Sequence, residues 1–239
     1  MRMIQYGSPL NRVVKIGDPF SCQSSGIVSA ITGYTTSDYQ SIADDAGLTF
    51  PNGDWAVIVI AKSNTSVGLE YILSNDTWGA ADSFQLTRSS GFFGFKVNSE
   101  ASLHATQTPG KWYVVCAQRS GTSTTIRSVD MGFSTFSTSV SGTLNVAIDS
   151  SNPLTIGGLA GLDGSVSDVI YLPGETVSNN DMQAIATGKA ITTFSWYPSL
   201  ELWAILQDTT GLDQTGNHTV TVTGTLTSTT GPSGLNRGI

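Results

Sequence analysis

The stretch from Leu154 to Lys189 decides the fold class: LTIGGLAGLDGSVSDVIYLPGETVSNNDMQAIATGK. It predicts a strand, a glycine turn, a second strand, another glycine turn and one short helix. In Ser165–Leu172, apolar residues occur at both odd-numbered and even-numbered positions, so both faces of a strand would carry them. This is typical of a strand covered on both faces. Within a strand-rich chain, this order predicts an all-β fold, a two-sheet antiparallel jelly-roll sandwich with one short helix near residues 178–187.

The predicted helix has its own start and stop signals. Ser178 and Asp181 have the spacing of a capping box, with Asp in place of the usual Glu. Val177 and Met182 stand where a hydrophobic staple would form, one residue before the cap and four after it. Gly188 follows as a C-terminal stop.

Strand candidates separated by turn signals occur at the spacing of a sandwich. They are 37–42, 53–62, 70–74, 83–88, 92–98, 111–119, 124–129, 144–148, 154–156 and 165–172. Residues 201–207 have weak helical spacing. The run HTVTVTGTLTSTTG, residues 218–231, predicts one edge-like strand that returns to the same sandwich.

The length of 239 residues fits one all-β domain. We expect an N-terminal arm at 1–16, a single sandwich at 17–228 and a C-terminal tail at 229–239. Cys22 and Cys116 are able to pair, but a buried reduced thiol is the favoured interpretation of Cys116, within the strand KWYVVCAQ.

Charge and hydropathy exclude several classes of function. Only 12% of residues are charged, the net charge is −7, and the basic residues are scattered, so we predict no nucleic-acid partner. No apolar run approaches the roughly 18–20 residues of a membrane span, so we predict no membrane insertion. The first residues, MRMIQYGSPLNRVV, lack the apolar centre of a signal peptide, so if the protein is extracellular we expect it to leave by cell lysis or another route.

Several segments resemble a known family when taken in order. They are DYQSIADDAGLTFPNGDWAVIVIAKS, YILSN, SFQLTRSSGFFGFKVNS, TPGKWYVVCAQRSG and PLTIGGLAGLDGSVSDVIYL with its helix. Together they resemble the laminin-G-like or concanavalin-A-like jelly roll, particularly single-domain versions in bacteriophage structural proteins. The resemblance covers roughly residues 20–190 and is sharpest at Pro109–Tyr113 and Asp163–Val169. Asp213–Gly224 is also similar to phage and microbial members. One such fold hosts lectins, hydrolases and inert modules, so the resemblance implies the fold more firmly than the function.

Catalytic patterns are missing from the sequence, and we predict that the protein is not an enzyme. Glycoside hydrolases of this fold resemble one another in two carboxylates placed two residues apart on one strand. Glu70, Glu100, Glu175 and Glu201 have no such neighbour, and Asp163 and Asp168 are expected on opposite faces. His104 and His218 lie in expected loops, away from any nucleophile motif or zinc ligand set. A glycoside hydrolase remains the remote alternative.

No cofactor is expected, with calcium as the one alternative. Asp76, in SNDTWG, and Asp163, in the turn before its strand, are the calcium candidates. The competing interpretation is that both are ordinary turn residues.

A sugar site requires an exposed aromatic ring surrounded by polar side chains. Trp78, in NDTWGAAD, is the first candidate, followed by Trp196 and Tyr197. The competing interpretation is that these rings fill the sandwich or an intersubunit contact. Trp55 and Trp112 are assigned to the core.

The favoured function is a non-enzymatic bacteriophage virion protein, either a capsid decoration protein or a tail or fibre module. Its expected partners are other virion proteins and further copies of itself, and its expected location is the virion. Lattice contacts are assigned to the two ends of the chain, at Met1, Arg2, Met3, Ile4, Leu235, Arg237 and Ile239. The alternative is a lectin that attaches to host surface glycans, and one jelly roll is able to serve both roles.

Overall fold

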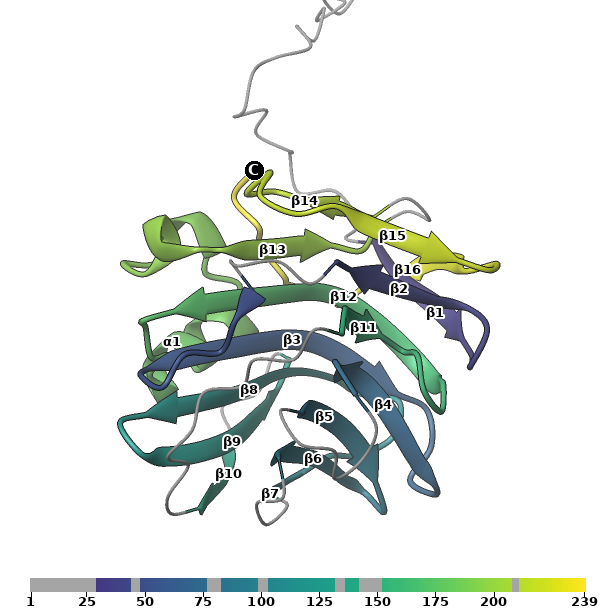
Figure 1. The fold of residues 1–239 in the computed structure, drawn as a ribbon, viewed down its shortest axis with the longest axis horizontal. Helices are drawn as coiled ribbons and strands as arrows, with labels where there is room; N and C mark the ends of the chain where they lie inside the picture. The colour runs from purple at the N-terminus through teal and green to yellow at the C-terminus, as the bar shows by residue number, and fades with distance from the viewer. Residues whose placement is uncertain are drawn as a thin grey trace, which may run out of the picture.

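Two antiparallel β-sheets lie face to face in the computed structural model, which describes residues 29–43, 48–76, 83–98, 103–131, 136–141, 152–207 and 211–239 (Figure 1). The strands are β1 (Ser29–Tyr34), β2 (Tyr39–Ile42), β3 (Trp55–Ser63), β4 (Leu69–Ser74), β5 (Phe84–Ser89), β6 (Phe92–Val97), β7 (Leu103–Thr106), β8 (Trp112–Ser120), β9 (Ser123–Asp130), β10 (Phe136–Ser141), β11 (Leu154–Ile156), β12 (Leu162–Pro173), β13 (Leu202–Ile205), β14 (Leu212–Asp213), β15 (Val220–Thr223) and β16 (Thr227–Thr230). The helical elements are α1 (Asn179–Ala186) and the 3-10 turns η2 (Ile191–Thr193) and η3 (Tyr197–Ser199).

The nine-stranded sheet has the order β10-β9-β8-β3-β12-β1-β16, and β13 and β14 extend it beside β12. The seven-stranded sheet has the order β15-β2-β11-β4-β5-β6-β7. All the strand pairs in both sheets are antiparallel among the described residues. The predicted two-sheet antiparallel jelly-roll sandwich is therefore confirmed.

An apolar core fills the space between the sheets. Trp55 is fully buried there, as predicted, and contacts Phe50, Phe84 and Phe95 at ring-centroid distances of 5.2, 6.0 and 6.1 Å. These contacts are edge-to-face, an arrangement that aromatic pairs favour. Trp112 is only half-buried, with the Lys62 ammonium 5.5 Å from its ring centre.

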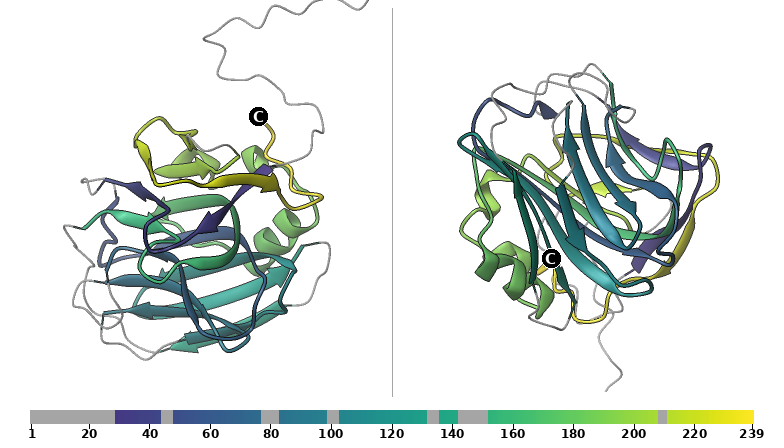
Figure 2. Two further views of the ribbon diagram at one scale, coloured as in Figure 1. Left: turned by 90° about the vertical axis from the view of Figure 1, so that its right-hand side faces the viewer. Right: turned by 90° about the horizontal axis from the view of Figure 1, so that it is seen from below.

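A second core lies on the outer face of the nine-stranded sheet, where α1 is seen beside β8 and β9 (Figure 2). The Ser178 side chain accepts from the Asp181 amide, and the Asp181 side chain accepts from the Ser178 amide, so the predicted capping box is confirmed. Val177 and Met182 are both buried. The prediction that both faces of β12 are covered is confirmed, because its apolar residues divide between the two cores.

A bulge in β12 changes the predicted alternation. Val166 pairs with Ala61 and Asp168 with Ile60, so Ser167 is one extra residue against β3. A bulge of this kind shifts the side chains that follow to the other face. Val166 and Val169 consequently both face the inner core. Strict alternation would have placed Val166 on the same face as Asp168 and on the opposite face from Val169.

Two local predictions near the C-terminus were wrong. Residues 202–205 form β13, because pairing with β12 outweighs their weak helical spacing. The threonine-rich run forms two strands, with β15 in one sheet and β16 in the other. Gly224 joins them at φ 76°, and a Cβ there would lie 2.2 Å from Asp38 Oδ1.

Strands β1, β7 and β10 were not predicted from sequence, and His104 therefore lies on a strand rather than in a loop. The predicted strand 144–148 lies outside the described residues. None of the described helices is long and apolar enough to cross a membrane.

Residues 229–239, expected as a tail, continue into the folded body. Thr229 and Thr230 belong to β16, which pairs with β1. Leu235 joins the core beneath α1. Arg237 is buried against Asp168 of β12.

Candidate functional site

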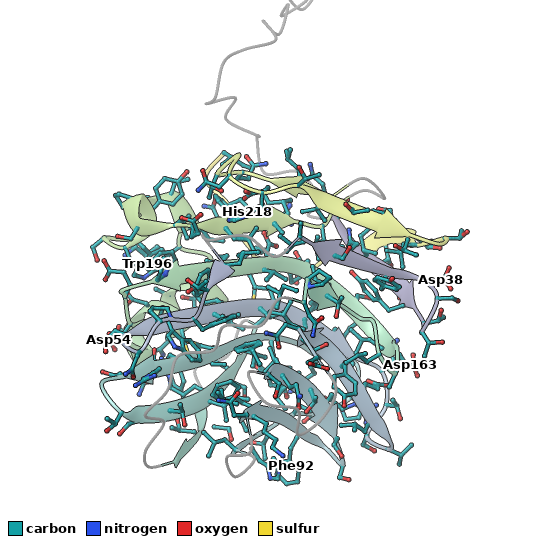
Figure 3. All side chains as sticks on the ribbon, in the orientation of Figure 1. Asp38, Asp54, Phe92, Asp163, Trp196 and His218 are labelled. Carbon is teal, nitrogen blue, oxygen red and sulfur yellow. The ribbon has the colours of Figure 1, made fainter. Side chains whose placement is uncertain are left out.

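Two of the three predicted sugar-stacking residues, Trp196 and Tyr197, are not fully exposed. Trp196 is buried and stacks on Phe194, with ring centroids 4.8 Å apart and planes 12° apart. Tyr197 is half-buried and lies edge-to-face against Trp203 at 6.1 Å. Both rings therefore belong to the layer around α1, where Figure 3 places Trp196, and they correspond to the competing core interpretation. Trp78 lies outside the described residues.

The two calcium candidates do not meet. The Asp163 amide donates to Glu70 near the start of β4, whereas Asp76 follows the other end of that strand. At about 3.3 Å per residue, they are separated by roughly 20 Å. Asp163 accepts from Asn64 and Asp76 from Asn152. In the described part of the chain, no group of three His, Cys, Asp or Glu side chains is placed to hold a metal ion.

The expected assembly contacts at the C-terminus are largely internal. Leu235 and Arg237 are each 7% exposed, because the chain's own residues cover them. Their side chains are therefore not available to neighbouring molecules, while Ile239 is half-buried. Met1, Arg2, Met3, Ile4 and Cys22 lie outside the described residues.

A polar pocket of about 270 Å³ lies where the β7 edge of one sheet approaches β8, β9 and β10 of the other. We call it the seam pocket. It is lined by Thr106, Gln107, Thr108, Lys111, Tyr113, Ser128, Asp130, Phe136 and Ser137. Five of these residues carry a hydroxyl group, one carries an amide, and Lys111 and Asp130 form an ion pair.

Two hydrogen bonds hold the sheets together at the pocket. The Thr106 amide donates to Ser137 Oγ at 2.8 Å, and Ser128 Oγ donates to the Thr106 carbonyl at 2.9 Å. Ser128 and Asp130 follow Ile126 at strand spacing and so face the same side of β9. Ile126 belongs to the inner core, which means that polar groups replace apolar ones as β9 approaches the pocket.

An ion pair crosses the pocket wall. Lys111 Nζ lies 2.8 Å from Asp130 Oδ2, with 49% of the lysine side chain exposed and 12% of the aspartate side chain. A hydrogen bond to Asp130, together with its negative charge, raises the pKa of Lys111. The lysine is therefore a charged residue at the mouth of the pocket, and its partner carboxylate lies deeper.

The pocket residues also keep two buried acceptor atoms without a partner. These atoms are Asp130 Oδ1 and Gln107 Oε1, to which no donor from the described residues is hydrogen-bonded. A buried acceptor that lacks a donor costs about 1–3 kcal/mol. A ligand that donates hydrogen bonds would recover part of that cost.

An exposed aromatic ring lies next to the pocket residue Thr106. Phe92 pairs directly with Thr106 across β6 and β7, and 39% of Phe92 is exposed. Its ring lies 5.8 Å from the His104 ring, on the outer face of the seven-stranded sheet. Figure 3 shows Phe92 at the lower margin of the molecule.

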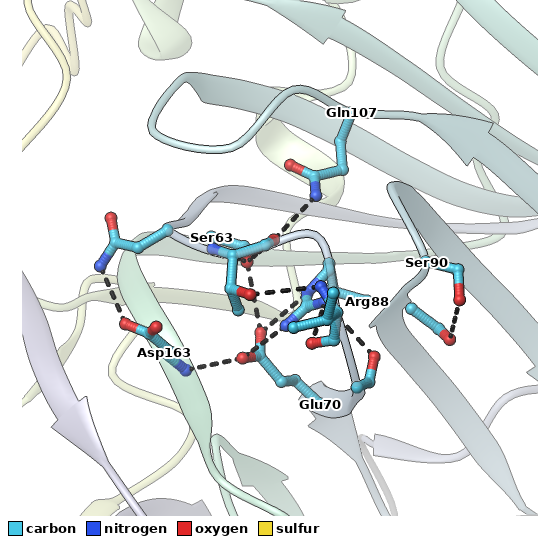
Figure 4. Close-up of polar contacts among 11 residues, drawn as sticks. Ser63, Glu70, Arg88, Ser90, Gln107 and Asp163 are labelled. Carbon is cyan, nitrogen blue, oxygen red and sulfur yellow. Dashed lines mark hydrogen bonds and ion pairs between the residues drawn. The ribbon is translucent and has the colours of Figure 1, made fainter.

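A buried ion pair is connected to the pocket lining through a chain of hydrogen bonds (Figure 4). Arg88 is fully buried, and its Nε donates to Glu70 Oε2 at 2.9 Å. Ser63 Oγ bridges Glu70 and the Thr65 carbonyl, at 3.3 and 3.0 Å. Gln107 Nε2 donates to the same Thr65 carbonyl at 3.2 Å, so this network reaches the pocket.

Neither the pocket nor the exposure of Phe92 was predicted from the sequence. One signal was available, since Ser128 and Asp130 occupy the inward register of a strand whose earlier inward residue is Ile126. The meeting of β7 with β9 and β10 carried no comparable signal, because it joins segments that are distant in the chain.

Comparisons with known proteins identify the class of fold. No family profile and no curated protein matches the sequence. A Bacteroides ovatus protein provisionally assigned as carbohydrate binding has a similar structure, with a TM-score of 0.63 and 15% identity over 88% of this chain. The chain spans 62% of the length of that protein.

Two further structures show related architecture. The LG1–3 region of the laminin α2 chain aligns with a TM-score of 0.50 and 15% identity, over 61% of this chain and 31% of the other. Tailspike protein 2 of an Escherichia coli O157:H7 bacteriophage aligns with a TM-score of 0.49 and 13% identity, over 78% and 30%. A TM-score of 0.49 carries no inference about this chain. The likeness to the first two confirms the laminin-G-like jelly roll at the level of the fold.

Proposed function

We propose that this protein is a carbohydrate-binding jelly-roll module, with its sugar site at the seam pocket and the adjoining Phe92 surface. The main support is the combination of a small polar pocket with an exposed ring one strand away. Sugars combine dense hydroxyls with apolar C–H faces, so they suit a site that offers both hydrogen bonds and an aromatic face. The provisional assignment of the similar Bacteroides ovatus protein is in keeping with this proposal.

The test is binding to an array of glycans by the wild-type chain and two variants. Phe92→Ala removes the exposed ring and is expected to lower the affinity for a bound glycan by about tenfold, since a stacking contact is worth about 1 kcal/mol or more. Leu212→Ala is the matched control, because Leu212 is 52% exposed and lies on β14, away from the pocket. The absence of any glycan binding, or equal binding by all three proteins, would contradict the proposal.

We also propose that binding is not followed by cleavage of the sugar chain. Among the described glutamates, Glu70 is held by Arg88, and Glu201 Oε1 lies 3.1 Å from His218 Nε2. Carboxylates engaged in this way are poorly suited to act as the acid and nucleophile of a glycoside hydrolase. Release of reducing ends from any bound polysaccharide during prolonged incubation would restore the hydrolase alternative.

A role on a bacteriophage particle is a second proposal, as a decoration, tail or fibre module that contacts other virion proteins and copies of itself. Its support is the resemblance of Asp163–Val169 and Asp213–Gly224 to phage members of the family. The test is sedimentation of intact particles, followed by measurement of the copy number of this chain. Its absence from washed particles would contradict this role without affecting sugar binding.

A further inference from the structure

We infer that the seam pocket selects uncharged sugars and discriminates against acidic sugars. This inference rests on the proposed function and specifies its ligand class. It follows from the balance of charges and of hydrogen-bonding atoms around Lys111 and Asp130.

The formal charges in the pocket lining cancel. Lys111 is the only cationic residue among the nine that line the pocket, and its ammonium is already paired with the Asp130 carboxylate at 2.8 Å. A uronic or sialic acid would therefore bring its carboxylate close to Asp130 without an uncommitted cation to balance it. The net charge of −7 on the chain adds a weaker repulsion of the same sign.

The hydrogen-bonding atoms favour a ligand that donates. Asp130 Oδ1 and Gln107 Oε1 are both buried acceptors without a donor from the described residues. Each of these atoms has almost no surface accessible to water, so a ligand hydroxyl reaches it only when a lining side chain moves. A sugar hydroxyl donates one hydrogen bond and also accepts, whereas an ionised carboxylate only accepts. Replacing a hydroxymethyl group by a carboxylate thus removes the hydrogen-bond donor that the two acceptor atoms need.

The hydroxyl groups of a neutral hexose suit both members of the ion pair, because they donate to the Asp130 carboxylate and accept from the exposed Lys111 ammonium.

The experiment measures affinities by titration calorimetry for matched sugars that differ in one group. Methyl glucoside and methyl glucuronide form one pair, and the corresponding derivatives of galactose and mannose form two more. In the pair that binds, we expect the neutral sugar to bind at least tenfold more tightly than the uronide. Equal or tighter binding of the uronide would overturn the inference while leaving carbohydrate binding intact.

Asp130→Asn separates recognition from structure. It removes the negative charge at nearly constant shape, so the neutral sugar should lose about tenfold in affinity and the neutral-to-uronide ratio should fall toward one. Asp181→Asn is the matched control on α1, across the nine-stranded sheet, and should leave both affinities unchanged. Thermal unfolding confirms that each variant is folded.

The remaining outcomes distinguish the two proposals. An unchanged neutral-to-uronide ratio in folded Asp130→Asn would overturn the inference, as would the binding of larger glycans with no response to any single sugar. The failure of every glycan, neutral or charged, to bind the wild-type chain would overturn the proposed function itself.

Discussion

Arg237 and Asp168 form a two-point ion pair in the interior of the protein, although they are 69 residues apart in sequence. Arg237 Nε lies 2.9 Å from Asp168 Oδ1, and Nη2 lies 2.9 Å from Oδ2. Trp203 Nε1 donates to the same carboxylate at 3.0 Å. Through this contact, the last residues of the chain are fixed to the long central strand β12.

Replacing Arg237 by Met leaves the Asp168 carboxylate buried without its cation. We expect a loss of about 3–5 kcal/mol in the free energy of unfolding, as for other broken buried ion pairs. Urea unfolding provides the measurement. Arg237→Lys keeps the charge but loses the two-point geometry, so it should fall between wild type and Arg237→Met.

A double-mutant cycle tests whether the two side chains act together. Asp168→Asn with Arg237→Met removes both charges, so the double variant should be more stable than the sum of the single losses predicts, by about 0.5–3 kcal/mol. Strict additivity would mean that the ion pair contributes no coupling and that each side chain acts alone.

Deletion of residues 235–239 tests the role of the C-terminal segment. The deletion removes Leu235 from the core beneath α1 and removes Arg237 from Asp168. A combined loss of about 5 kcal/mol corresponds to a fall of roughly 10–20 °C in Tm for a chain of this size. Scanning calorimetry measures the change, and an unchanged Tm would support the original expectation of a tail that serves only for contacts.

The sequence predicted the elements whose signals are local. The capping box at Ser178 and Asp181 acts over three residues, and the apolar positions of β12 reveal that both of its faces are covered. The bulge at Ser167 was not predictable, because it depends on the register of β12 against β3. Residues 202–205 were misassigned for a similar reason, since their conformation is determined by a partner strand.

Site residues were harder to predict than the fold. A tryptophan in a sequence does not reveal whether it is exposed, and Trp196 is covered by the packing of the segment that follows α1. Phe92 was assigned to a strand, but its exposure at a sheet surface depends on what lies over β6. The seam pocket requires four strands to meet, so only the tertiary structure reveals it.

Cys116 provides a pH-dependent reporter of unfolding. Burial raises the pKa of its thiol from 9.0 to about 11, despite the opposing effect of Arg127. Because the thiolate is the reactive form, we expect slow alkylation of the native protein at pH 8 in a Cys22→Ser background. Urea should accelerate labelling in parallel with unfolding, and rapid labelling without urea would contradict the burial of this thiol.

The same pKa shift makes a contribution to stability that depends on pH. The folded state favours the neutral thiol, so this contribution is complete below pH 9 and is lost as the pH rises from about 9 to about 11. Cys116→Ala lacks the titrating group, and its free energy of unfolding should therefore fall less steeply over this interval. Identical slopes for the two proteins would exclude the thiol as a source of the alkaline loss.

The Glu70–Arg88 ion pair is expected to support both folding and the seam pocket. Glu70→Gln leaves the fully buried Arg88 guanidinium beside a neutral amide, which should cost about 3–5 kcal/mol in the free energy of unfolding. Glu175→Gln is the matched control. Glu175 accepts a hydrogen bond from Ser199, away from the pocket, and its loss should change stability by about 0.5 kcal/mol or less.

The effect on the pocket should appear as weaker sugar binding in the protein that remains folded. Glu70 reaches the pocket wall through Ser63, the Thr65 carbonyl and Gln107, so a displaced Glu70 loosens a residue of the lining without removing any group from it. Calorimetric titration of folded Glu70→Gln should therefore show a reduced affinity, while the preference for neutral sugars over uronides, which depends on Asp130 and Lys111, is retained. Loss of that preference together with the affinity would indicate that the ion pair organises the Asp130 side of the pocket as well.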